Sequence, residues 1–169
     1  MRFLSIGCLA GGPIMPNASD MASRAARAQT LLMRSDDARF STWDTHQVDA
    51  FVDLLADAFV LRDTTISAPI TTRDGVRDYA RAWLTAFPDM RIRRTSRLVD
   101  EADDTVAAEV EFTGTNTGPL TVGARQVPPT GKAVVGRGAY FARMKAGRFV
   151  ELSFHPDQAG VLAQLGLMP

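Results

Sequence analysis

The hydrophobic pattern of this chain changes its period near Met90. Before that point apolar residues recur at helical spacing, as in Val76, Ala80 and Trp83. After it, apolar and polar residues alternate, most regularly through 106–112. Because the two periods cannot serve the same element, the sequence predicts helices first and a run of half-buried strands afterwards. That order favours an α+β fold with helices on one face of an antiparallel sheet.

Turn-forming segments divide the second half of the chain into four predicted strands. The segments lie at 100–104, 113–131 and 145–147. The strands are expected at 90–99, 105–115, 132–144 and 148–154.

The helices are delimited by capping residues and by proline. We expect helices at 22–33, at 47–56 with Thr45 as its cap, from Thr72 to Pro88, and from Asp157 to Gly166. Between the second and third helices, 58–63 is predicted as a short strand and 66–72 as an irregular arm.

The chain is predicted to form a single domain over 21–169. Residues 1–20 are expected to be a disordered extension or the product of a misassigned start. Their apolar run is interrupted by Gly11, Gly12 and Pro13, which leaves it too short for a secretory signal.

Composition excludes several classes of partner. With 19 Lys and Arg against 19 Asp and Glu, the sequence does not predict a basic surface for nucleic acid or an anionic membrane. Cys8 is the only cysteine and there are two histidines, so neither an intrachain disulfide nor an ordinary zinc site is expected. We therefore predict a cytoplasmic protein without a metal, whose ligand is a neutral or weakly charged small molecule or another protein.

Three local strings resemble the SnoaL-like polyketide cyclases, also called ester cyclases. They are LTAFPD at 84–89, FTGTNTG at 112–118 followed by PTGK at 129–132, and GRFVE at 147–151 followed by Asp157 and the QLG of 164–166. The resemblance covers about 22–167. It departs from the family at Arg62 and Asn116, where the family often has His, and at Pro156, where it usually has an aromatic residue.

The resemblance implies the nuclear transport factor 2-like fold, a cystatin-like α+β roll. In this fold a curved antiparallel sheet is wrapped by N-terminal helices into a cone-shaped barrel around a pocket for a small apolar molecule. The resemblance also implies a homodimer formed through the exposed sheet face. No cofactor is expected, and no glycine-rich phosphate-binding motif opens a helix.

Three residues are candidate catalytic groups. The resemblance assigns a general acid/base role to Asp157, which by its position is equally a helix cap. His155, two residues earlier, either faces the same side or lies in solvent or core. Adjacent strand residues point to opposite faces, so only one of Arg62 and Asp63 can face inward. Asp63 is favoured as a second carboxylate that could pair with Asp157 in acid/base catalysis. The alternative is a turn-forming Asp63 and a surface Arg62.

Aromatic side chains are the predicted pocket walls, although aromatics at helical spacing more often belong to a core. The candidate substrate-binding residues are Trp83, Tyr79, Phe87, Tyr140 and Phe154, together with Arg62 and Asn116.

The leading functional hypothesis is an enzyme that performs cofactor-independent acid/base catalysis, an aldol-type ring closure, on an apolar carbonyl substrate. An epoxide hydrolase or isomerase on the same fold is one alternative, and epoxide opening would require Asp157 and Asp63 to converge on one pocket. A non-catalytic ligand-binding or dimerisation module is the other, favoured if Asp157 is only a cap and the pocket contains no other titrating group.

Overall fold

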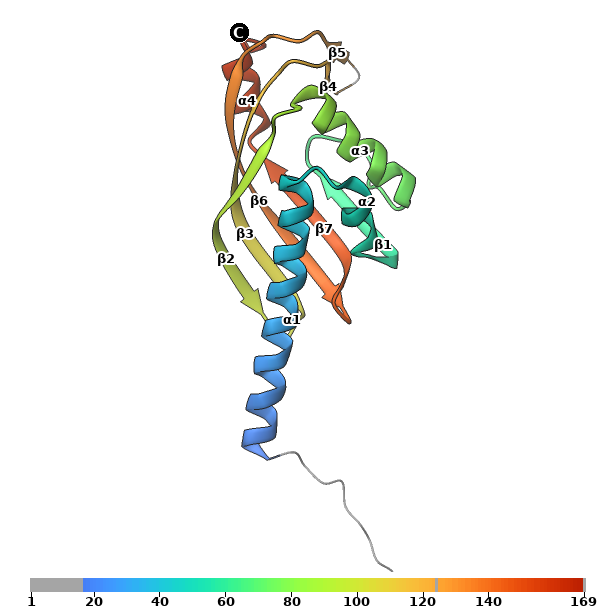
Figure 1. Ribbon diagram of the computed structural model, residues 1–169, viewed down its shortest axis with the longest axis vertical. Coiled ribbons are helices and arrows are strands. Elements are labelled where there is room, and N and C mark those ends of the chain that lie inside the picture. The colour runs from blue at the N-terminus through green and yellow to red at the C-terminus, as the bar shows by residue number, and fades with distance from the viewer. Residues whose placement is uncertain (1–16, 124, 169) are drawn as a thin grey trace, which may run out of the picture.

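A five-stranded sheet forms the centre of the molecule. The computed structural model describes residues 17–123 and 125–168 (Figure 1). The strands are β1 (Leu55–Asp63), β2 (Arg91–Asp100), β3 (Thr105–Thr115), β6 (Ala133–Lys145) and β7 (Arg148–Pro156), in the order β1-β7-β6-β3-β2. The pairs β2/β3, β3/β6 and β6/β7 are antiparallel, whereas β1 lies parallel to β7. The four strands predicted after Met90 are confirmed to within two residues at each end.

The long connection predicted at 113–131 contains a hairpin that the alternation did not predict. It consists of β4 (Leu120–Val122) and β5 (Arg125–Val127). Each strand has only three residues, which is too short for a hydrophobic period to be recognised.

The first helix is longer than predicted. Helix α1 (Ala18–Asp44) runs without a break through the polar stretch 34–44, which sequence reasoning treated as a connection. Thr45 ends this helix, with its backbone N–H on Ser41, and does not begin the next one. This stretch can form a buried helix because Asp36 pairs with Arg94 of β2 and accepts a hydrogen bond from Tyr140 of β6.

The remaining helices follow their predicted signals more closely. Helix α2 (Val48–Asp53) is shorter than expected because β1 begins at Leu55. Helix α3 (Arg73–Ala86) is capped by Thr72, whose hydroxyl accepts from the Gly75 N–H, and ends before Pro88 as predicted. Helix α4 (Gln158–Leu165) is capped by Asp157 and ends at Gly166, which adopts a left-handed conformation with φ of 75°.

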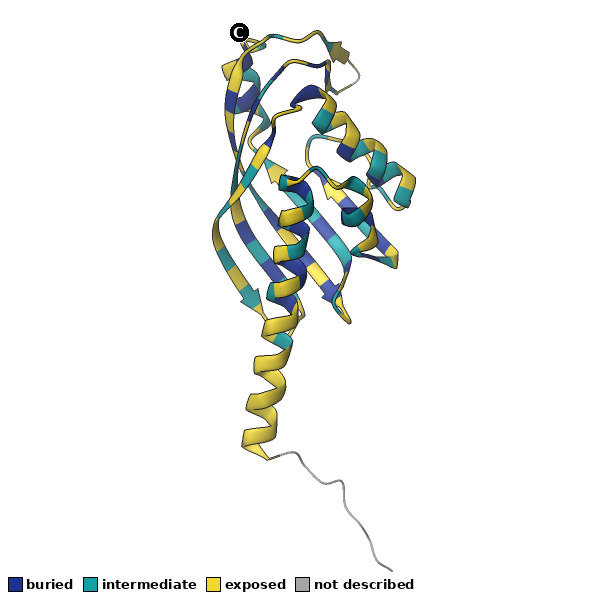
Figure 2. Ribbon diagram, in the orientation of Figure 1, coloured by how far each residue is buried: buried dark blue, intermediate teal, exposed yellow. Residues whose placement is uncertain are grey.

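The N-terminal half of α1 projects beyond the sheet and is exposed to solvent (Figure 2). Of the predicted disordered extension 1–20, residues 1–16 lie outside the described residues, and residues 18–20 form the first turn of α1. In the part of the chain that is described, no helix is both long and apolar enough to cross a membrane.

The hydrophobic core lies between the inner face of the sheet and the helices α1, α2 and α3 (Figure 1). Phe51, Leu61, Val76 and Phe149 are completely or almost completely buried there. The outer face of the sheet carries Phe141, which is 56% exposed. The homodimer expected through this face stays a prediction.

Candidate active site

A cavity opens between α1, α3 and the inner face of the sheet. It has a free volume of about 90 Å³ and opens to solvent, and most of its wall is apolar. The apolar wall includes Trp43, Trp83, Met90, Ile92, Val110 and Phe112. A concave, largely apolar wall with a few polar groups is typical of sites for small organic molecules.

Asp63 is the carboxylate that lines this cavity, and it is only 5% exposed. It stands at the end of β1, where its Oδ1 accepts a hydrogen bond from the Thr65 N–H at 2.7 Å. Its Oδ2 accepts one from the Tyr79 hydroxyl at 2.5 Å. A carboxylate has about four acceptor positions, so two bonds orient Asp63 and leave capacity for a ligand.

Tyr79 is positioned by α3 and by an aromatic neighbour. Its ring stacks on Phe154 of β7, with centroids 6.5 Å apart and planes 6° apart. Burial raises the pKa of the Tyr79 hydroxyl well above its ordinary value, and the negative charge of Asp63 adds to this effect. Tyr79 therefore remains a hydrogen-bond donor to Asp63 throughout the neutral range.

Arg62 points away from the cavity. Its guanidinium forms an ion pair with Glu151 on β7, and both side chains are about half exposed. Adjacent strand residues face opposite sides of a sheet, so the inward position of Asp63 places Arg62 outside. The structure thus corrects the predicted substrate-binding role of Arg62.

Asp157 caps α4 and does not line the cavity. Its Oδ1 accepts from the Gly160 N–H at 2.8 Å, which satisfies one of the unpaired donors at the start of the helix. The two carboxylates that sequence reasoning expected to converge, Asp157 and Asp63, therefore belong to separate places in the structure.

His155 borders the cavity, but its imidazole lies on the outer face of the sheet. Nε2 is 3.0 Å from the Ser153 hydroxyl, and the ring meets the exposed Phe141 edge to face at 5.7 Å. The preceding residue of β7, Phe154, faces the cavity instead. Strand alternation thus separates His155 from the interior, contrary to one of its two predicted orientations.

The predicted aromatic wall divides into two layers. Trp83, Tyr79 and Phe154 line the cavity directly. Phe87 and Tyr140 are buried and are not among the lining residues: Phe87 packs behind Trp83 at 6.0 Å, and the Tyr140 hydroxyl donates to Asp36 at 2.6 Å.

Asn116 holds a loop together and does not reach the cavity. Its Nδ2 donates to the backbone carbonyls of Ala86 and Gly118, and its Oδ1 accepts from Thr130. Because Asn116 is buried with its amide fully paired, it has a structural role in place of the predicted ligand contact.

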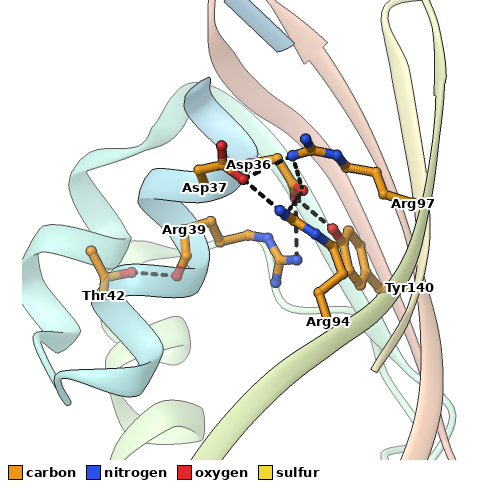
Figure 3. A network of polar contacts seen from close by, with 7 residues as sticks. All are labelled: Asp36, Asp37, Arg39, Thr42, Arg94, Arg97 and Tyr140. Atoms are coloured by element: carbon orange, nitrogen blue, oxygen red, sulfur yellow. Dashed lines mark hydrogen bonds and ion pairs between the residues drawn. The ribbon is translucent and has the colours of Figure 1, made fainter. Parts of the chain in front are cut away.

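Arg39 is a cavity residue that sequence reasoning missed. It is 1% exposed, lines the cavity from α1, and lies beside a group of charged side chains (Figure 3). Its signal was available: Leu32, Asp36, Arg39 and Trp43 share one helical face. A stretch containing three charged residues in six did not suggest a buried face.

Metal binding has no evident location among residues 17–123 and 125–168. No three His, Cys, Asp or Glu side chains gather there at a spacing that would hold an ion. The expectation that catalysis needs no cofactor stays a prediction.

The architecture defines the class of protein. A curved sheet with helices on its inner face and a cavity between them is the nuclear transport factor 2-like fold, also described as ketosteroid isomerase-like in solved structures that this chain resembles.

The chain belongs to the SnoaL-like polyketide cyclase family, whose sequence profile matches residues 36–165. This confirms the family predicted from the three strings. No curated protein matches the chain.

Three solved structures illustrate the shared fold. AclR from Streptomyces galilaeus, a putative hydroxylase, is 21% identical with a TM-score of 0.69, covering 86% of this chain and 84% of AclR. A putative SnoaL-like polyketide cyclase from Jannaschia sp. CCS1 is 16% identical with a TM-score of 0.71, covering 83% and 94%. IdmH from Streptomyces antibioticus, a putative polyketide cyclase, is 23% identical with a TM-score of 0.66, covering 80% and 98%.

Proposed function

We propose that the protein is an enzyme that uses Asp63 as a general base on an apolar carbonyl compound held in the cavity. The observation that carries this proposal is a buried carboxylate, oriented by two hydrogen bonds, at the wall of a largely apolar cavity. Membership of the SnoaL-like polyketide cyclase family supports it.

The proposed reaction begins with proton transfer from the carbon next to a carbonyl group to Asp63. The resulting enolate carbon forms a bond with a second carbonyl carbon of the same molecule, and the new alkoxide oxygen takes the proton back from Asp63. No atom is gained or lost overall. The aromatic walls would hold the chain in a folded conformer with its reacting carbons close together, which removes much of the entropic barrier.

A related isomerisation would use the same first step, with the proton returned to a different carbon. Epoxide opening is less well supported, because its second predicted carboxylate, Asp157, is a helix cap away from the cavity. A non-catalytic binding module would have the same cavity without proton transfer.

Proton transfer can be tested without knowledge of the natural substrate. We expect the wild type to accelerate exchange of the α-protons of 2-tetralone in D2O, followed by NMR. Asp63→Asn should lose at least about 100-fold of that acceleration, since a general base contributes about 10²–10⁴-fold. Asp157→Asn is the matched control and should retain the rate.

Exchange at the uncatalysed rate in the wild type, with 2-tetralone bound, would favour the binding module. Loss of exchange in Asp157→Asn, with Asp63→Asn unaffected, would restore the catalytic role that the resemblance first assigned to Asp157.

A further inference from the structure

A cluster of five charged side chains connects α1 with β2 behind the cavity. We call Asp36, Asp37, Arg39, Arg94 and Arg97 the α1 cluster (Figure 3). It contains three guanidiniums and two carboxylates, so it has one positive charge in excess.

Asp36 is completely buried, and both of its carboxylate oxygens accept hydrogen bonds. Oδ2 accepts from Arg94 Nη1 at 2.5 Å and lies 3.5 Å from Arg97 Nη1, while Oδ1 accepts from the Tyr140 hydroxyl at 2.6 Å. Arg39 has the longest hydrogen bond to this carboxylate, from Nη2 to Oδ1 at 3.4 Å.

The second carboxylate of the cluster also forms its hydrogen bonds with arginines other than Arg39. Asp37 is about half exposed and accepts from Arg94 Nη2 at 2.6 Å and Arg97 Nη1 at 2.8 Å. The two β2 arginines thus take the best hydrogen bonds of both carboxylates, and the excess charge falls on Arg39.

Arg39 is also incompletely hydrogen-bonded. Its Nε is buried and has no hydrogen-bond partner among the described residues. Buried polar groups in native proteins are almost always paired, so Arg39 retains an unused hydrogen-bond donor. The side chain lines the same cavity as Asp63.

Aromatic rings hold the Arg39 guanidinium without neutralising it. Its central carbon lies 3.9 Å from the ring centroid of Tyr140 and 4.5 Å from that of Phe40. Cation–π contacts of this kind fix the position of a guanidinium and leave its charge available to an anion.

We propose that Arg39 binds an anionic oxygen, such as a carboxylate, carried by the ligand of the cavity. The substrate class would then be an apolar carbonyl compound with an acidic group at one end. This inference rests on the proposed function for the identity of the cavity as the substrate site, and it separates the roles of two residues: Arg39 binds the acid and Asp63 moves the proton.

The test compares 2-naphthoate with its uncharged methyl ester by isothermal titration calorimetry. The wild type should bind the acid at least about 10-fold more tightly, because a charge-assisted hydrogen bond is worth that factor or more. Arg39→Met should lose the preference, and Arg39→Lys should keep only part of it.

Arg93→Met is the matched control. It removes a guanidinium of β2 that pairs with Glu111, outside the α1 cluster, and Arg93 does not line the cavity, so the preference for the acid should remain. Equal binding of acid and ester by the wild type, or an undiminished preference in Arg39→Met, would overturn the inference.

A second measurement does not depend on the folding of a variant. In the wild type, 2-naphthoate should shift the NMR signal of the Arg39 Nε–H, and the methyl ester should not. An unchanged signal at saturation with the acid would also overturn the inference.

The two proposals can fail separately. A preference for the acid that persists in Asp63→Asn, combined with no 2-tetralone exchange in the wild type, would leave Arg39 as a ligand anchor and remove the proposed catalysis. Exchange that depends on Asp63, without a preference for the acid, would do the reverse.

Discussion

Two buried carboxylates in this protein each accept a hydrogen bond from a tyrosine, yet their surroundings differ. Asp36 accepts a hydrogen bond from the Tyr140 hydroxyl at 2.6 Å and also forms ion pairs with arginines of α1 and β2. Asp63 accepts hydrogen bonds from the Tyr79 hydroxyl at 2.5 Å and from one backbone N–H, and it faces the cavity.

The difference teaches how to separate a structural acid from a candidate catalytic one. A carboxylate surrounded by cations has its charge compensated and its acceptor positions occupied, which suits it to joining elements. A carboxylate with only neutral donors and a cavity beside it can still accept a proton. The following predictions test this contrast.

The largest expected effect is on stability. Asp36→Asn would leave Arg39, Arg94 and Arg97 without their shared buried anion, and breaking a buried ion pair in this way costs about 3–5 kcal/mol. Asp63→Asn should cost less, because no cation depends on it. Urea unfolding of both variants gives the comparison, and a larger loss for Asp63→Asn would contradict it.

Alkaline pH should destabilise the folded protein through ionisation of Tyr140, which donates a hydrogen bond to Asp36. Burial raises the pKa of the Tyr140 hydroxyl to about 12; the positive charge of Arg39 opposes this effect and Asp36 adds to it. A pKa that is higher in the folded state than in the unfolded state stabilises the fold. This contribution is fully present below the unfolded-state pKa of about 10 and is lost as the pH rises towards 12.

The loss would approach about 3 kcal/mol for a shift of this size. The measurement is the free energy of unfolding of the wild type relative to that of Tyr140→Phe, between about pH 9 and 12. This range begins below the ordinary tyrosine pKa of about 10. A constant difference across that range would mean that Tyr140 titrates normally.

The two tyrosines should differ in their effect on catalysis. Tyr79→Phe removes a hydrogen bond that orients Asp63, and we expect about a 10-fold slower exchange of 2-tetralone, equivalent to one hydrogen bond of about 1.4 kcal/mol. Tyr140→Phe removes a buried hydroxyl that donates to Asp36 and should leave the rate unchanged. Equal losses in both variants would show that the effect is general loosening of the fold.

The smallest effect concerns the carboxylate that lies in neither environment. Asp157→Ala should destabilise the protein by about 1 kcal/mol, the usual value of an N-cap, without changing exchange. Thr72→Ala, which removes the cap of α3, is the matched control for thermal unfolding. A loss of exchange in Asp157→Ala alone would contradict the assignment of Asp157 as a cap.

Part of the candidate site was accessible from the sequence. Strand alternation predicted that only one of Asp63 and Arg62 faces inward, and the helical spacing of Tyr79 and Trp83 placed them on the face of α3 that lines the cavity. His155 had two possible orientations, and nothing local distinguished them. Arg39 was missed because its burial depends on the ring of Tyr140 on β6, about a hundred residues away in the sequence.

The sequence by itself determined the order of helices and strands, the caps at Thr72 and Asp157, and the family. These depend on period, propensity and local hydrogen bonds within a few residues. Only the tertiary structure decided that 34–44 is helical, that Asp157 lies apart from Asp63, and that a positive charge at Arg39 lines the cavity. The physical reason is that the cost of burying a charge depends on partners brought together from distant segments, which no local pattern records.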